Sequence, residues 1–248
     1  ATPHEFPYII SFQGMKNEDI NSDGTHFCGG SIMNDQWILT AAHCVDAFSK
    51  YNSVKIVAGA HNIRTGNLNE QKRKPRKTVK HPKYPGPLGP FDIALVQLNI
   101  PFDLNQFVAK MQLPIGNPYY PIGHGTVAGW GSTSNTSVHV YPEILQKAEI
   151  PMVPAYKCYS PEAGGFNGHL TTLCAGPLDG SKSICFADSG GPLVQRTLQG
   201  EPFQIGVVSS GYFPCGTFDQ TGKYVNVSFF LQWIHETIGV KIGCLLNQ

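Results

Sequence analysis

Three short segments carry residues that together could cleave an acyl bond. His43 follows an apolar run, Asp92 precedes another, and Ser189 lies in an Asp-Ser-Gly-Gly-Pro sequence. A serine hydroxyl is a poor nucleophile unless an adjacent base takes its proton. An imidazole can take that proton near neutral pH, and a carboxylate can hold the imidazole in the required tautomer. The three residues, in this order, therefore predict nucleophilic acyl transfer.

Each of these residues also has an ordinary structural interpretation when it is considered alone. A histidine often forms only structural hydrogen bonds, and an aspartate before an apolar strand often caps a turn. Gly-Gly-Pro often forms a turn and nothing more. Their joint occurrence with these neighbours makes coincidence a poor explanation.

The elements that would position these residues are predicted to be short strands. The chain has 248 residues, of which 41% are hydrophobic and 14% charged, with 27 glycines and 19 prolines. Apolar or alternating runs recur between Gly, Pro, Asn and Asp, which indicates an all-β barrel or sandwich. The expected strands are Trp37–Thr40, Val54–Ala58, Ile93–Leu98, Thr126–Ala128, Phe203–Val208 and Tyr224–Val227.

One α-helix is expected near the end of the chain. Its apolar face comprises Phe230, Trp233, Ile234 and Ile238. We expect Ser228 to cap its first turn and Gly239 to end it, because these residue types favour those positions.

The charge balance excludes several classes of partner. The chain has 18 basic and 17 acidic residues and a net charge of +1, so no overall field favours nucleic acid. No apolar run is long enough to predict a membrane span. One local basic run extends over Lys72–Lys77. It could bind an acidic protein or a sulfated glycan, or it could simply be a solvated edge strand, where lysines discourage further pairing.

The seven cysteines indicate a secreted, extracellular protein with disulfide bonds, since none of them forms a Cys-x-x-Cys pair. Asn135 in Asn-Thr-Ser and Asn226 in Asn-Val-Ser are candidate glycosylation sites on a secretory route. Because seven cysteines cannot all pair with one another, one thiol is left over, and we assign it to Cys244. This thiol could be free, could form a covalent bond to a partner or to a removed propeptide, or could have no role.

The chain resembles the chymotrypsin/trypsin-like serine proteases, and most of all the invertebrate members that have three disulfides. The resemblance extends over almost the whole chain. It is carried by Pro7-Tyr8, Cys28–Ser31, Thr40–Cys44, His81–Tyr84, Asp92–Leu95, Gly129–Gly131, Cys174–Gly176, Asp188–Pro192, Val208-Ser209 and Trp233-Ile234.

The resemblance implies a fold of two six-stranded antiparallel β-barrels with a C-terminal α-helix. Residues 1–239 would form one peptidase domain, divided near residue 105 into its two barrels, and residues 240–248 would form a tail. It also implies disulfides that join Cys28 to Cys44, Cys158 to Cys174, and Cys185 to Cys215.

The resemblance also implies a role for each site residue. His43 is expected to act as general base and then general acid, with Asp92 orienting it and Ser189 forming the acyl-enzyme. Ser209 is expected to donate a hydrogen bond to Asp92. The backbone amides of Ala187 and Ser189 are expected to form the oxyanion hole.

Two features depart from the family pattern near the oxyanion hole. Ala187 stands where the family has glycine, so its methyl group could crowd the turn or favour a flipped peptide, or it could be tolerated with modest strain. The family pairs the amino group of a freed Ile-Val-Gly-Gly terminus with the aspartate that Asp188 matches. This chain starts at Ala1, which corresponds to a position beyond that start. If Ala1 is the mature terminus, we expect zymogen-like behaviour; if residues precede it, no such expectation follows.

The substrate pocket is expected to accept apolar side chains. Ser183 matches the residue at the floor of the primary pocket, and a serine there argues against a preference for Arg or Lys. Ile184 beside it is expected to narrow the pocket. The other expected substrate-binding residues are Phe186, Ser209, Ser210, Gly211 and Gly222.

No metal or cofactor is expected. The segment that matches the family's calcium loop offers only Glu70 as a carboxylate among basic residues. The sequence therefore predicts a secreted serine endopeptidase that acts on proteins or peptides with chymotrypsin-like preference. The alternative is a catalytically impaired or zymogen-locked homologue that acts as a binding or regulatory module.

Overall fold

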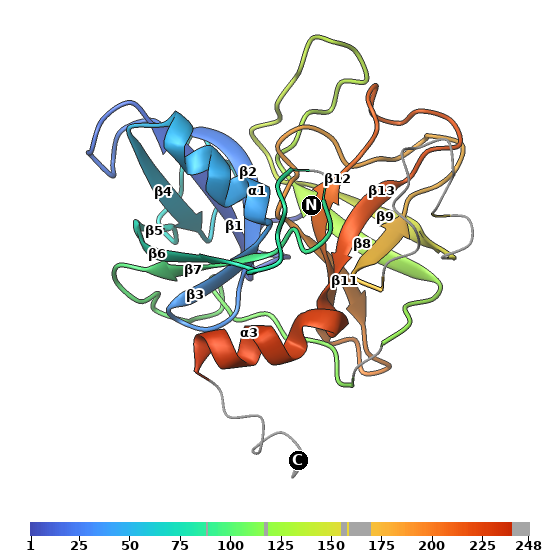
Figure 1. Cartoon of the computed structure of the whole chain (residues 1–248). Coiled ribbons are helices and arrows are strands. Elements are labelled where there is room, and N and C mark those ends of the chain that lie inside the picture. The colour runs from blue at the N-terminus through green and yellow to red at the C-terminus, as the bar shows by residue number, and fades with distance from the viewer. Residues whose placement is uncertain (88, 117–118, 155–157, 159–169, 240–248) are drawn as a thin grey trace.

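The chain folds into two antiparallel β-sheets that lie side by side (Figure 1). This architecture comes from a computed structural model, which describes all residues except 88, 117–118, 155–157, 159–169 and 240–248. The expected all-β class is confirmed, as is the helix near the C-terminus. The predicted tail and Cys244 lie outside the described residues.

The first sheet has seven strands in the order β5-β4-β1-β2-β3-β7-β6. The strands are β1 (Ile9–Met15), β2 (Thr25–Ile32), β3 (Trp37–Thr40), β4 (Ser53–Ala58), β5 (Gln71–Arg73), β6 (Pro75–Lys80) and β7 (Ala94–Leu98). This sheet forms the first of the two expected barrels as a half-barrel of seven strands, with β5 and β6 at its two edges. Only Lys74 separates these two strands in the chain, so the sheet must curl until its edges meet.

The second sheet is a closed six-stranded barrel, as predicted. Its strands are β8 (His124–Gly129), β9 (Gln146–Val153), β10 (Thr172–Ala175), β11 (Pro192–Arg196), β12 (Pro202–Ser210) and β13 (Gly222–Asn226). Closure leaves no free edge, since every strand pairs with two neighbours.

The C-terminal helix begins later than the sequence indicates. A 3-10 turn, η3 (Val227–Phe230), precedes α3 (Leu231–Ile238). Ser228 is not the N-cap, because the cap position is Phe230 and no side chain caps the helix. The buried Ser228 hydroxyl instead donates to Asn226 Oδ1. Gly239 ends the helix with a φ of 79°, as predicted.

All three expected disulfides are present: Cys28–Cys44, Cys158–Cys174 and Cys185–Cys215. Closing a loop of this size with a disulfide contributes about 3 kcal/mol to stability. One of the candidate glycosylation sites is disfavoured. Asn226 is buried and its amide donates to Leu170 O, so the folded chain has no room for a glycan there. Asn135 is exposed.

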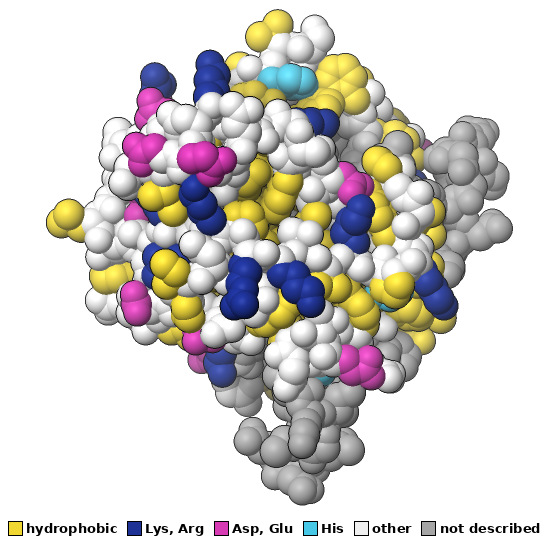
Figure 2. All heavy atoms as spheres, turned by 60° about the vertical axis from the view of Figure 1, so that its left-hand side comes forward, with side chains coloured by type: hydrophobic (Ala, Val, Ile, Leu, Met, Phe, Trp, Pro, Cys, Tyr) yellow, Lys and Arg dark blue, Asp and Glu magenta, His cyan; other side chains and the backbone are white. Residues whose placement is uncertain are grey.

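The basic run lies on the two edge strands β5 and β6 and on Lys74 between them. Lys74 pairs with Glu18, and Arg73 lies 3.6 Å from Asp103. In the described part of the chain, Lys72, Arg76 and Lys77 form no ion pair. Figure 2 shows this side of the molecule, where basic, acidic and hydrophobic side chains are interspersed rather than gathered into one basic face. The edge-strand interpretation therefore fits better, and a partner for Lys72–Lys77 stays a prediction.

No helix in the described part of the chain has both the length and the apolar character needed to span a bilayer.

Candidate active site

His43 lies in the first turn of α1 (Ala42–Asp46), which follows β3 directly. Its Nδ1 lies 2.7 Å from Asp92 Oδ2, and its backbone N–H donates to Asp92 Oδ1 at 2.9 Å. Asp92 is 1% exposed and ends the loop before β7. Because a carboxylate only accepts, Nδ1 must carry a proton, which leaves Nε2 of the neutral ring free to accept one.

Ser209, near the end of β12, also faces Asp92. Its hydroxyl donates to Asp92 Oδ2 at 2.7 Å, as the resemblance implies. The carboxylate thus accepts three hydrogen bonds, two from His43 on α1 and one from Ser209 on β12. These bonds compensate for its burial, which would otherwise be costly for a charged group.

Ser189 is held at the junction of the two sheets by the glycines that follow it. Its carbonyl accepts a hydrogen bond from Gly29 N at 2.8 Å. Gly190 has a φ of 79°, and a Cβ there would lie 2.2 Å from Thr40 Oγ1 and 2.5 Å from Gly29 O. Only glycine fits this position, which explains the Ser-Gly-Gly sequence physically.

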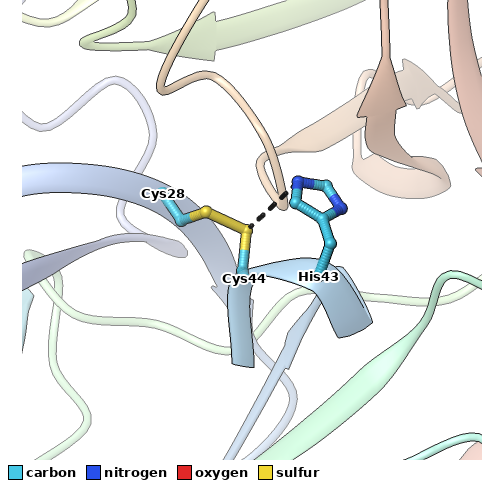
Figure 3. Close-up of side chains that lie close together, drawn as sticks. All are labelled: Cys28, His43 and Cys44. Atoms are coloured by element: carbon cyan, nitrogen blue, oxygen red, sulfur yellow. Dashed lines mark hydrogen bonds between the residues drawn. A yellow bond between two sulfur atoms is a disulfide. The ribbon is translucent and has the colours of Figure 1, made fainter. Parts of the chain in front are cut away.

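Ser189 and His43 line the same cavity of about 230 Å³. Both residues are described, and no hydrogen bond joins them. His43 Nε2 instead lies 3.8 Å from Cys44 Sγ, which is bonded to Cys28 beneath the ring (Figure 3). The hydrogen bond between a catalytic serine and its histidine is often long in unliganded sites and tightens when substrate binds.

The cluster of Cys28, His43 and Cys44 does not suit a metal ion. Their ligand atoms lie within 4.8 Å of one another. However, the two sulfurs are joined as a disulfide and offer no thiolate, which is the form that binds metal.

The turn before Ser189 has the backbone conformation that glycine normally supplies. Ala187 has a φ of 74°, so its methyl group is tolerated in the left-handed region at a cost of about 1–2 kcal/mol. Its carbonyl oxygen lies 3.0 Å from His26 Nε2. The left-handed φ agrees with the alternative of tolerance with strain, and the direction of the Ala187 N–H stays a prediction.

His26 is a residue of this site that the sequence did not reveal. Its Nδ1 lies 2.8 Å from Ser11 Oγ, on β1, while Nε2 faces Ala187 O. Burial lowers the pKa of His26 to about 4, so the ring is neutral near pH 7. Nε2–H then donates to Ala187 O, and Nδ1 accepts from Ser11. No local pattern marks this contact, because 161 residues separate its two ends.

Asp188 borders a second cavity, of about 470 Å³. Its carboxylate accepts hydrogen bonds from Gly131 N and Cys185 N, both at 2.9 Å. No described residue forms an ion pair with it, and burial raises its pKa to about 6. A Cβ at Gly129 or Gly131 would lie within 2.4 Å of this carboxylate, so both glycines are required for its position.

The expected substrate-binding residues do not all reach the cavity that holds Ser189. Those that line it are Ile184, Phe186, Ser209, Ser210 and Gly211. Ser183 and Gly222 are absent from the described residues that line it. Ser183 is exposed and lines the cavity beside Asp188, so its expected place at the pocket floor stays a prediction. The two cavities share a wall, because Ile184, Cys185, Val208 and Cys215 line both of them.

Comparisons with known proteins agree with this geometry. The Trypsin family model matches residues 1–234. "Serine protease 1" of Rattus norvegicus is 37% identical over 241 residues, which cover 96% of this chain and 87% of the relative. "Trypsin" of Sus scrofa is 36% identical over 243 residues, covering 96% and 93%. "Anionic trypsin" of Canis lupus familiaris is 37% identical over 220 residues, covering 88% and 82%.

Proposed function

Because the chain belongs to the trypsin family of serine proteases, we propose that it is a secreted serine endopeptidase. In this proposal Ser189, His43 and Asp92 form the catalytic triad. The observation that carries it is the 2.7 Å contact between His43 Nδ1 and Asp92 Oδ2, beside a cavity that also holds Ser189. Membership of the family implies protein substrates.

The proposed reaction is acyl transfer in two steps. Ser189 Oγ attacks the peptide carbonyl while its proton passes to His43 Nε2, and Asp92 stabilises the imidazolium. His43 then gives that proton to the departing amine, which leaves an acyl-enzyme. Water repeats the sequence with His43 again as base, and releases the acid and free Ser189.

The amides of Ala187 and Ser189 are proposed to bind the oxyanion that forms in each step. Each such donor contributes about 10²–10³ in rate. His26 supports this role as a positioning residue, because its hydrogen bond to Ala187 O fixes the turn. Asp188 supports it from the other side by holding the amides of Gly131 and Cys185. The family pattern implies that an amino group pairs with Asp188. Such a group, reaching Asp188 through the adjoining cavity, would hold the turn around Ala187 more firmly.

The proposed preference is for apolar over basic residues on the acyl side of the cleaved bond. The described residues that line the cleft include no carboxylate that could pair with Arg or Lys. Val208 and Ile184 contribute apolar surface instead. This lining favours an apolar over a basic side chain, as the sequence predicts.

Labelling with a fluorophosphonate tests the proposal, since the reagent reacts with an activated serine. We expect stoichiometric modification at Ser189, read by peptide mass, and none in Ser189→Ala. Asp92→Asn should slow peptide hydrolysis by about 10⁴-fold while leaving the fold intact. A folded wild-type protein that shows neither labelling nor turnover would overturn the proposal in favour of the impaired homologue.

The same family pattern supports a single peptidase domain over residues 1–239, with its two barrels divided near residue 105. Asn135 is the proposed glycosylation site because its side chain is exposed on a loop.

A further inference from the structure

Ile184 forms part of the wall of the cleft. This side chain is 5% exposed and lines the cavity of about 230 Å³ that also holds Ser189. It also lines the adjoining cavity, which contains Ser183, one residue earlier, and Asp188. Ile184 therefore lies between the two cavities.

Two glycines flank the Ile184 side chain. A Cβ built on Gly222 would lie 3.0 Å from Ile184 Cδ1 and Cγ1, and one on Gly211 would lie 3.5 Å from Ile184 Cγ1. The isoleucine thus fills the space that the absence of side chains at these two positions would otherwise leave open. It packs in one buried cluster with Val208 and Tyr224.

The position of Ile184 is held from several sides. Its carbonyl accepts a hydrogen bond from Ser183 Oγ at 2.8 Å, and the next residue, Cys185, is bonded to Cys215. The buried Tyr224 hydroxyl has no hydrogen-bond partner among the described residues and lies 3.0 Å from a Cβ built on Gly222. An isoleucine that is branched at Cβ and closely packed has few other rotamers available. A substrate ring cannot displace it without disturbing the cluster.

We propose that Ile184 restricts the residue on the acyl side of the cleaved bond to small aliphatic side chains, such as those of Ala and Val. This inference rests on the proposed endopeptidase function and names its substrate class. Among apolar residues, Phe and Tyr are excluded by size, because their rings would need the volume that Ile184 occupies. Arg and Lys are excluded by the same volume and because the described residues that line the cleft include no carboxylate.

The direct test compares tetrapeptide nitroanilides that differ only in the last residue, Ala, Val or Phe. We expect wild type to have a higher kcat/KM for Ala and Val than for Phe. In Ile184→Ala the ratio of Phe to Ala should rise by at least about 10-fold, since one or more methylenes of pocket space is worth that much. Ile205→Ala is the matched control, because Ile205 is buried in the same cluster but does not line the cleft. It should leave the ratio unchanged.

A binding measurement separates this inference from the proposed function, because it needs no turnover. Indole binding is followed by calorimetry, with its position read from the NMR shifts of the Gly211 and Gly222 amides. We expect no binding in the cleft of wild type or of Ile205→Ala, and measurable binding in Ile184→Ala. If wild type binds indole there, or cleaves after Phe as well as after Ala, the inference is overturned. If labelling of Ser189 fails while indole binds only to Ile184→Ala, the proposed function is overturned. The limit that Ile184 sets on the size of a bound side chain is then still supported.

Discussion

At the residue scale, Ala187 holds a backbone conformation that glycine normally supplies. Its φ of 74° places a methyl group where glycine is favoured. The hydrogen bond from His26 holds the turn in this conformation despite the strain. The local cost is therefore offset by a contact with a distant strand.

Ala187→Gly should stabilise the protein. Holding a residue that has a side chain in the left-handed region costs about 1–2 kcal/mol. The added freedom of glycine in the unfolded chain costs about 0.4–1 kcal/mol. We expect the free energy of unfolding in urea to rise by about 0.5–1 kcal/mol. The rate of fluorophosphonate labelling should stay the same or rise. Ala148→Gly, in strand β9 with ordinary backbone angles, should change stability in the opposite direction. A loss of stability in Ala187→Gly would contradict this account.

At the element scale, α1 has only five residues and carries His43. A helix this short is not stable alone. Its position therefore depends on the bonds that join it to the sheet. The Cys28–Cys44 disulfide joins it to β2, and His43 Nε2 lies 3.8 Å from one of the sulfurs (Figure 3).

Two disulfides allow a controlled test of this tie. Cys28–Cys44 and Cys158–Cys174 both span 16 residues, so each double Cys→Ala variant should lose about 3 kcal/mol of stability. Only the first should also slow the labelling of Ser189, because only that bond restrains α1. The check measures labelling rates under conditions where both variants remain folded. Equal rates in the two variants would show that the disulfide does not position His43.

At the scale of the whole molecule, two groups beside the oxyanion turn give stability opposite pH dependences. The pKa of His26 is lowered from 6.5 to about 4, so the unfolded state binds more protons in that interval and stability rises with pH. The pKa of Asp188 is raised from 3.8 to about 6, so the folded state binds more protons and stability falls as pH rises. Between pH 4 and 6 the two effects partly cancel.

Asp188→Asn removes one side of this balance. We expect the free energy of unfolding of the variant to rise more steeply between pH 4 and pH 6 than that of wild type. The difference should reach about 1–2 kcal/mol across the interval, after allowance for residual solvent around the carboxylate. Urea titrations at several pH values measure this slope, and Asp35→Asn, at an exposed site, serves as the control. Parallel curves for Asp188→Asn and wild type would contradict the raised pKa.

The sequence by itself determined the all-β class and the segments that carry His43, Asp92 and Ser189. Alternating strand patterns and motifs such as Ser-Gly-Gly are local, so each can be identified in one segment at a time. The family and the cysteine pairs followed from the resemblance over almost the whole chain.

Only the tertiary structure decided that the first sheet has seven strands with β5 and β6 at its edges, that His26 holds Ala187, and that Ile184 lies between the two cavities. Each of these depends on the packing of residues far apart in the chain. Ser183 and Ile184 are neighbours in sequence, yet only Ile184 lines the cavity that also holds Ser189. Which of two neighbouring residues reaches that cavity depends on the packing of the surrounding barrel, and no local pattern records it.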